Sequence, residues 1–106
     1  MPGYDPLPEQ HFDWIEEKGG SVRIARFKGN GVIMSIVQMK EGAEVPAHSH
    51  SLGSYMYVTS GALEVDGHLL SAGDAGKCQP GYGHYPVKTV QDSTYVVCRD
   101  IEDEMT

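Results

Sequence analysis

The 106-residue chain has little basic charge, few cysteines and no long hydrophobic run, and each shortage excludes a class of protein. Its 8 Lys and Arg residues against 15 Asp and Glu give a net charge of −7, so it lacks the basic surface that nucleic-acid binding requires. No apolar stretch approaches the roughly 18 residues that a membrane-spanning helix needs. The opening MPGYDPLPEQHFDW has no basic segment followed by an apolar one, as a secretory signal would have. We therefore expect a cytoplasmic protein with neither a nucleic-acid nor a membrane partner.

The cysteines and the acidic residues give no sign of a functional site. Cys78 and Cys98 lie far apart and form no CxxC motif, so we expect reduced, mostly buried thiols. The acidic residues gather near the two ends, in WIEEK and in RDIEDEMT. We interpret both clusters as solvated surface that aids solubility.

The pattern after the first twenty residues is almost wholly that of β-strands. Residues 1–20 are expected to form an arm with a helical turn at most, and residues 21–106 one all-β domain. Asp66-Gly67 between ALEV and HLLS is typical of a two-residue hairpin turn, in which both residues need positive φ. Short strands that recur every 8–12 residues or so predict a β-sandwich or barrel. The strand VIMSIVQM is apolar on both faces, which favours a position inside a sandwich or at a subunit contact.

Two histidines, His48 and His50, lie one residue apart in the segment PAHSH. On an extended strand such residues point to the same face, about 6.5–7 Å apart. Two imidazoles placed this way can bind one metal ion at about 2.0–2.1 Å each. Neutral imidazole is a good ligand for iron, zinc, nickel and copper. The pair alone is equally compatible with two surface histidines.

The surroundings of this pair resemble the two motifs of the cupin superfamily, G-x5-HxH-x3,4-E-x6-G and G-x5-PxG-x2-H-x3-N. The residues that fit the first motif are Gly42, His48, His50 and Gly61, and those that fit the second are Gly73, Gly81 and His84. The resemblance implies an all-β, single-domain cupin, that is, a jelly-roll β-barrel or double-stranded β-helix with a short N-terminal arm. It also implies a metal site formed by His48, His50 and His84.

The chain departs from the motifs where the family has a metal-binding glutamate. That position falls on Ser54, or on Tyr55 if the register slips by one residue. Glu44 cannot replace it unless the strand breaks at Pro46, because four residues along an extended strand separate it from His48 by about 13 Å. A fourth protein ligand is therefore left open. We expect Ser54, Met56 and Gln38 to line the substrate pocket.

A divalent ion held by three neutral imidazoles keeps a charge of +2 and open coordination positions, so it should favour a small anionic or chelating substrate. Small cupins with three histidines and no glutamate include iron-dependent dioxygenases that cleave acetylacetone or dihydroxyacetophenone, and this chain is similar in layout. The resemblance implies an Fe²⁺ dioxygenase acting on an enolisable ketone or dicarbonyl compound, with Zn²⁺, Ni²⁺ or Mn²⁺ as other candidate ions.

Three alternatives stay open: a metal-dependent isomerase, lyase or cyclase acting on a sugar or small acid, a non-catalytic ligand-binding cupin, and a cupin without metal. A homodimer is expected, because small cupins commonly pair through an outer sheet.

Overall fold

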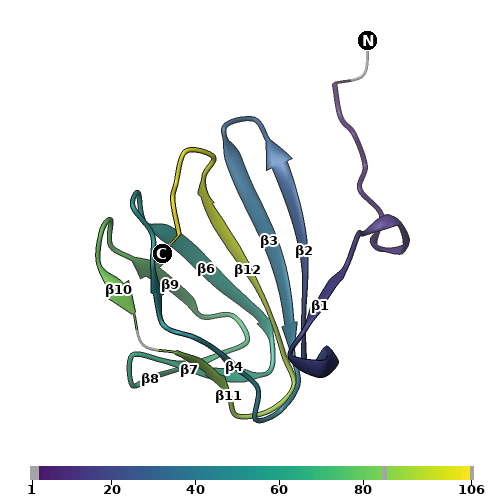
Figure 1. The fold of residues 1–106 in the computed structure, drawn as a ribbon. Helices are drawn as coiled ribbons and strands as arrows, with labels where there is room; N and C mark the ends of the chain where they lie inside the picture. Colours follow the sequence, from purple (N-terminus) through teal and green to yellow (C-terminus); the bar gives the residue numbers. More distant parts are fainter. Residues whose placement is uncertain (1–2, 85, 106) are drawn as a thin grey trace.

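The computed structural model describes residues 3–84 and 86–105, with the backbone alone at His84. Within these ranges the chain consists of short strands joined by tight turns (Figure 1). The strands are β1 (Ile15–Glu17), β2 (Val22–Gly29), β3 (Val32–Met39), β4 (Glu44–Val45), β5 (His48–Ser49), β6 (Ser54–Ser60), β7 (Ala62–Val65), β8 (His68–Ser71), β9 (Ala75–Cys78), β10 (Gly83–His84), β11 (Val87–Thr89) and β12 (Ser93–Asp100). Two 3-10 turns, η1 (Glu9–His11) and η2 (Lys18–Gly20), are the helical elements of these ranges, and neither could cross a membrane.

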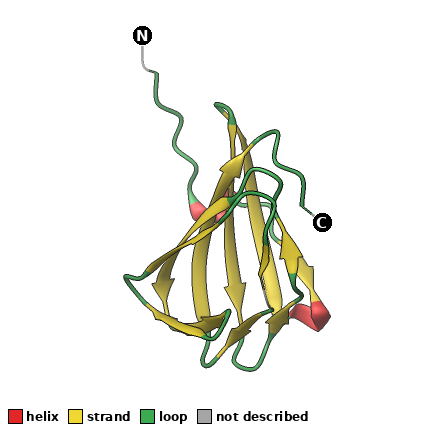
Figure 2. Ribbon diagram, turned by 90° about the vertical axis from the view of Figure 1, so that its left-hand side faces the viewer, coloured by secondary structure: helices red, strands yellow, loops and turns green. Residues whose placement is uncertain are grey.

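The strands form two main sheets and one small ribbon, and their pairings are antiparallel. The larger sheet has the order β1-β2-β3-β12-β6-β9, and the smaller has the order β4-β11-β7-β8. The ribbon pairs β5 with β10. Figures 1 and 2 show the sheets curving into a cup, with β4, β7, β8 and β11 toward one end. The predicted all-β fold is confirmed.

Two hairpins follow the turn chemistry of the sequence. Strands β2 and β3 pair in continuous register from Val22↔Met39 to Gly29↔Val32. Strands β7 and β8 are joined by Asp66 and Gly67, whose φ angles are 51° and 74°. Positive φ at both central positions is what a type I′ turn requires, so this predicted hairpin is also confirmed.

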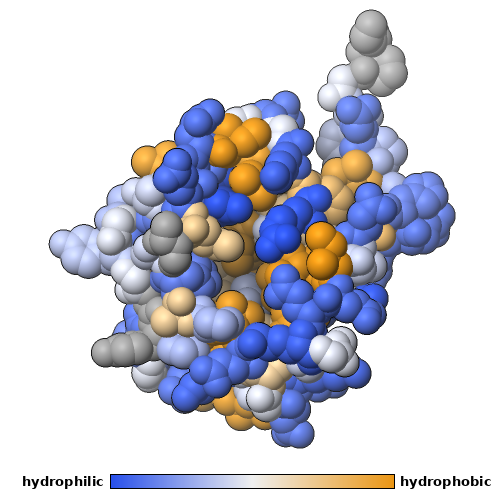
Figure 3. All heavy atoms as spheres, in the orientation of Figure 1, coloured by the Kyte–Doolittle hydropathy of each residue, from blue (hydrophilic) through white to orange (hydrophobic). Residues whose placement is uncertain are grey.

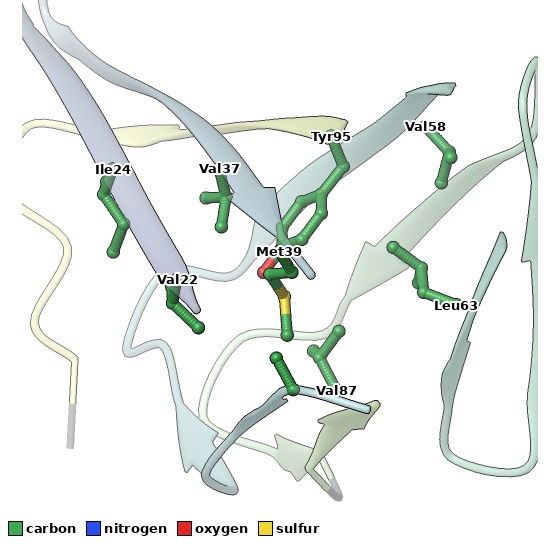
Figure 4. Packing of buried hydrophobic residues seen from close by; sticks show 9 residues of the cluster. Val22, Ile24, Val37, Met39, Val58, Leu63, Val87 and Tyr95 are labelled. Carbon is green, nitrogen blue, oxygen red and sulfur yellow. The ribbon is translucent and has the colours of Figure 1, made fainter. Parts of the chain in front are cut away.

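The hydrophobic core fills one end of the cup (Figure 4). Alternation along β3 points Val37 and Met39 inward, where they meet Tyr95 of β12. Leu63 of β7 in the smaller sheet and Val58 of β6 in the larger sheet are fully buried beside them. Burial of a side chain of this size is worth about 1.5–3 kcal/mol, so these residues hold the two sheets together at that end.

The N-terminal arm covers the outer face of β2. Phe12 packs against Phe27 with ring centroids 4.9 Å apart, and the guanidinium carbon of Arg23 lies 4.0 Å from the ring centroid of Trp14. The sequence predicted a helical turn at most in this arm, yet residues 15–17 form the edge strand β1. They do so because β2 offers backbone groups that β1 can pair with, from Ile15↔Ile24 to Glu17↔Val22.

Replacing Gly61 by Ala should destabilise the fold far more than the same change at Gly67. Both glycines have positive φ, 83° and 74°. A Cβ at Gly61 would lie 2.2 Å from the carbonyl oxygen of Asp92, whereas one at Gly67 meets nothing within 4 Å. We expect Gly61→Ala to lower the free energy of unfolding by about 3 kcal/mol or more, and Gly67→Ala by about 1 kcal/mol. Chemical denaturation of both variants measures this, and equal losses would contradict it.

Candidate metal centre

His48 lies in β5, and His50 follows directly after this strand. β10 pairs with β5 so that the backbone of His84 is opposite that of His48. His50 forms an isolated bridge with Met105 near the C-terminus. The side chain of His50 is buried, with 3% of the residue exposed, and His48 is half-buried. Three segments far apart in sequence therefore meet at the histidine pair.

Hydrogen bonds at Nδ1 determine which nitrogen of each ring carries its proton. Nδ1 of His48 lies 2.9 Å from the carbonyl oxygen of Pro46, and Nδ1 of His50 lies 2.7 Å from Oδ2 of Asp103. A carbonyl and a carboxylate only accept hydrogen bonds, so both rings donate from Nδ1. A neutral imidazole protonated at Nδ1 has its lone pair on Nε2. Each histidine thus presents Nε2 as the ligating atom.

The two Nε2 atoms converge to 3.1 Å, with the ring planes at 73° to each other. Two nitrogens bound to one ion at 2.0–2.1 Å, with angles of roughly 90–110°, lie about 2.8–3.4 Å apart. The spacing and tautomers of His48 and His50 therefore fit two adjacent ligands of one transition-metal ion. The third predicted ligand is the side chain of His84, which is outside the described part of the structure. Without it, the described residues contain no group of three metal-binding side chains.

Asp103 is buried beside the pair and accepts several hydrogen bonds. Its side chain has no exposure to solvent, and Arg99 donates to Oδ2 from 3.1 Å. Burial alone would raise the pKa of Asp103. The bonds from the Leu52 N–H, His50 and Arg99 outweigh burial and hold this pKa below its ordinary value. The prediction that the acidic C-terminal segment is solvated surface is wrong for Asp103, because its carboxylate is paired inside the protein.

A cavity of about 1050 Å³ adjoins His48 and His50. Ser54 and Met56 of β6 line it. In the space-filling view, hydrophobic residues gather toward the middle of the face that Figure 3 shows. The apolar part of the wall comes from both sheets and includes Ile24, Val37, Val65, Leu70, Val87, Tyr95 and Val97. Burial raises the pKa of Tyr95, so its phenol stays neutral at physiological pH.

The structure places Gln38 away from this cavity. Its neighbour Val37 lines the cavity, and alternation along β3 sends Gln38 to the outer face. There its side-chain oxygen accepts a hydrogen bond of 2.6 Å from Nε of Arg23. Alternation also separates Ser54 from Tyr55, which is 64% exposed and outside the cavity lining. Of the two positions that could match the family's glutamate, Ser54 is the one that lines the cavity.

The cavity wall is more basic than the chain as a whole. Two carboxylate residues, Glu17 and Asp66, line it, together with the cationic residues Lys18, Arg26 and Arg99. Lys77 also borders the cavity, but it is opposite Tyr55 in the register, so its side chain points to the outer face. With Arg99 counted as neutralised by Asp103, two cations balance the two carboxylates. Since the chain as a whole has a net charge of −7, the cavity repels an anionic ligand less than the rest of the surface does.

Cys78 is the thiol that lines the cavity. Burial raises its pKa, and the negative charges of Asp66 and Asp103 raise it further. The thiol is therefore mostly protonated at neutral pH in the metal-free protein, which makes it a poor nucleophile. Cys98 is exposed, contrary to the expectation of two mostly buried cysteines, because it lies on the outer face of β12; both cysteines are free thiols.

Asp103 and Arg99 are the two site residues that sequence analysis missed. Arg99 lines the cavity as the last inward-facing residue of β12, and Asp103 follows four residues later. An Arg and an Asp at this spacing near an acidic end look like surface charges. Neither composition nor alternation predicts that a residue 53 positions from His50 would bond to its ring.

Comparison with solved structures places this fold among enzymes and a regulatory complex. An acetylacetone dioxygenase from Acinetobacter johnsonii is 12% identical, with a TM-score of 0.75 over 99% of this chain and 86% of that chain. The polyketide cyclase RemF from Streptomyces resistomycificus is 14% identical, with a TM-score of 0.79 over 94% and 81%. A chain from the Rhodobacter sphaeroides SigE complex with the anti-sigma ChrR is 24% identical, with a TM-score of 0.74 over 88% and 52%. At these identities the likeness shows the fold alone.

No curated protein sequence is significantly similar to this chain. A family model, in contrast, covers nearly the whole chain. The model described as the ChrR cupin-like domain matches residues 8–101, from the N-terminal arm to the end of β12. This match agrees with the two antiparallel sheets of the fold. The chain belongs to the ChrR cupin-like domain family, within the cupin superfamily.

Proposed function

We propose that this chain is a metal-binding cupin whose ion activates a small anionic, chelating molecule in the adjoining cavity. The observation that carries the proposal is the convergence of Nε2 of His48 and Nε2 of His50 to 3.1 Å, with both Nδ1 atoms engaged by acceptors. The pairing of the His84 backbone with His48 supports His84 as the third ligand.

The activity that we propose is cleavage of an enolisable ketone or dicarbonyl compound by a dioxygenase. When bound, Fe²⁺ supplies Lewis-acid chemistry toward an enolate and redox chemistry toward O₂, whereas Zn²⁺, Ni²⁺ or Mn²⁺ would suit a cyclase or isomerase. The fold shared with an acetylacetone dioxygenase supports iron, and the fold shared with a polyketide cyclase supports the alternative.

The residues of the chain position the substrate, attract its negative charge and exclude water from it. Arg26 in the cavity wall attracts an anionic substrate. The apolar side chains of Val37, Val97 and Met56 line the space beside the histidines and exclude water from the reacting group. Ser54, where the family has a glutamate, leaves the site without an additional negative charge. An anionic substrate then supplies that charge.

A second candidate function is ligand or metal sensing without turnover. The family match to the ChrR cupin-like domain favours it, because a chain in a complex of an anti-sigma with its sigma factor shares this fold. The same site would then bind metal and an anionic ligand and transmit occupancy to a partner. Turnover is what distinguishes the two functions.

The direct test is oxygen uptake by protein loaded anaerobically with Fe²⁺. With a panel of β-dicarbonyl compounds and aryl hydroxyketones, we expect at least one substrate to support O₂ consumption in proportion to bound iron. His48→Ala and His50→Ala should each abolish uptake and reduce bound iron. His11→Ala, which removes an exposed histidine of the N-terminal arm, should retain both. Stoichiometric iron without turnover of any compound would favour the sensing function.

Restoring a glutamate at position 54 should tighten metal binding. Ser54→Glu places a carboxylate on the cavity side of β6, where an added negative ligand raises affinity for a divalent ion by about tenfold or more. Tyr55→Glu adds the same charge on the outer face and should leave affinity within about twofold of wild type. Competition titration with a chromophoric chelator measures both, and equal effects would contradict the placement of Ser54.

We also propose that two copies pair through the outer face of β12 and β6. The register sets Ile36, Val96 and Tyr57 side by side, and Cys98 beside Tyr55. Tyr55 and Tyr57 are 64% and 49% exposed. These outward positions carry no carboxylate, so two chains of net charge −7 can meet here without direct repulsion.

Light scattering coupled to size-exclusion chromatography tests the dimer at micromolar concentration. We expect a mass of twice the 11.6 kDa chain for wild type and a monomer for Tyr57→Lys, which buries a charge in the contact. Leu69→Lys, which changes an exposed residue of β8, should stay dimeric. A wild-type monomer would refute the proposal.

A further inference from the structure

The hydrogen bonds to Asp103 hold its carboxylate in one orientation. Oδ1 accepts the Leu52 N–H from 2.8 Å, and the Ser51 hydroxyl lies 3.5 Å away. Oδ2 accepts the His50 Nδ1–H from 2.7 Å and Arg99 Nη1 from 3.1 Å. The side chain has no solvent exposure. A rotated carboxylate would have to break charge-assisted bonds with no water to replace them.

The backbone around Asp103 is tied to the histidine segment independently of its side chain. The Ser51 N–H donates to the carbonyl oxygen of Glu104 from 2.9 Å, and the Glu104 N–H donates to the Ser51 hydroxyl from 2.8 Å. Arg99 Nη1 also donates to the Asp103 carbonyl oxygen from 3.1 Å. The segment 101–105 is therefore held against Ser51 by two further bonds, and Arg99 ties it to the end of β12.

The two histidines obtain their orientation from different sources. His48 donates to Pro46, two residues earlier, so its tautomer depends on local chain geometry. His50 donates to a residue 53 positions later, which is in place only when the C-terminal segment is docked. Without that acceptor, the His50 ring can rotate or carry its proton on Nε2, the atom that faces His48.

We propose that Asp103 is a positioning residue that holds the proton of His50 on Nδ1 and aims Nε2 at the metal ion. The segment 101–105 is then part of the site, because it delivers the carboxylate. The inference rests on the proposed function only in taking a metal ion as what Nε2 of His50 binds. Metal binding and docking of the segment stabilise each other, since both require His50 in the same orientation.

Asp103→Asn tests this with Glu104→Gln as its control. Both variants remove one carboxylate from adjacent positions, but Glu104 is exposed and contacts Ser51 through its backbone. Zn²⁺ affinity is measured by chelator competition, because Zn²⁺ needs no anaerobic handling. We expect Asp103→Asn to weaken Zn²⁺ binding by about 10–100-fold, and Glu104→Gln by less than about twofold.

The tautomer of each histidine in metal-free protein is read from long-range ¹H–¹⁵N NMR. We expect Nδ1–H at both histidines in wild type, and loss of this state at His50 but not at His48 in Asp103→Asn. A merely structural role for Asp103 would alter stability without this selective change. If Asp103→Asn does not fold, Asp103→Glu keeps a charge for Arg99 while displacing the carboxylate, and the same two effects are expected.

Unchanged affinity together with an unchanged His50 tautomer in a folded variant would overturn the role of Asp103. A wild-type protein that binds no Zn²⁺, Fe²⁺ or other divalent ion would instead overturn the proposed function. In that case the tautomer comparison alone decides whether Asp103 positions His50: selective loss of Nδ1–H at His50 supports it, and no change refutes it.

Discussion

The hydrogen bond between Nδ1 of His50 and the buried carboxylate of Asp103 joins the C-terminal segment to the proposed metal centre. A carboxylate without solvent exposure is stable only when its charge is compensated, and Arg99 together with the Leu52 N–H does this. These partners come from the end of β12 and from the segment after β5, so the same interaction docks the C-terminal residues and orients the ring. In our proposal, this interaction aims Nε2 of His50 at Nε2 of His48, 3.1 Å away.

The most tightly packed side chains and the proposed metal centre lie in different parts of the cup. Leu63, Val58 and their neighbours pack tightly at one end, while the histidines, Arg99 and Asp103 occupy the other. Alternate residues of β3, β6 and β12 face inward along these strands, so the same two-residue period supplies the side chains at both ends of the cup. The inward residues change from apolar to polar as the histidines are approached. The charges around the cavity balance, in a chain of net charge −7, so a small anionic ligand is repelled less there than elsewhere on the surface.

Much of this architecture follows from local patterns. The Asp66-Gly67 turn has the positive φ angles that its sequence requires, and β2, β3, β7 and β8 run where alternation predicted. Ser54 and Met56 line the cavity, whereas Gln38 lies on the outer face, because one residue along a strand reverses the face. Asp103 was beyond prediction from the sequence, since its burial depends on where β12 ends and on bonds to residues about fifty positions away.

Anomalous diffraction from crystals of metal-loaded protein tests the central claim most directly. Data collected on either side of the absorption edge of the bound ion place that ion without reference to activity. The account predicts a single strong peak about 2.0–2.2 Å from Nε2 of both His48 and His50, with Nδ1 of His50 still bonded to Asp103. A peak elsewhere in the chain, ligation through Nδ1, or no peak at these histidines would contradict it.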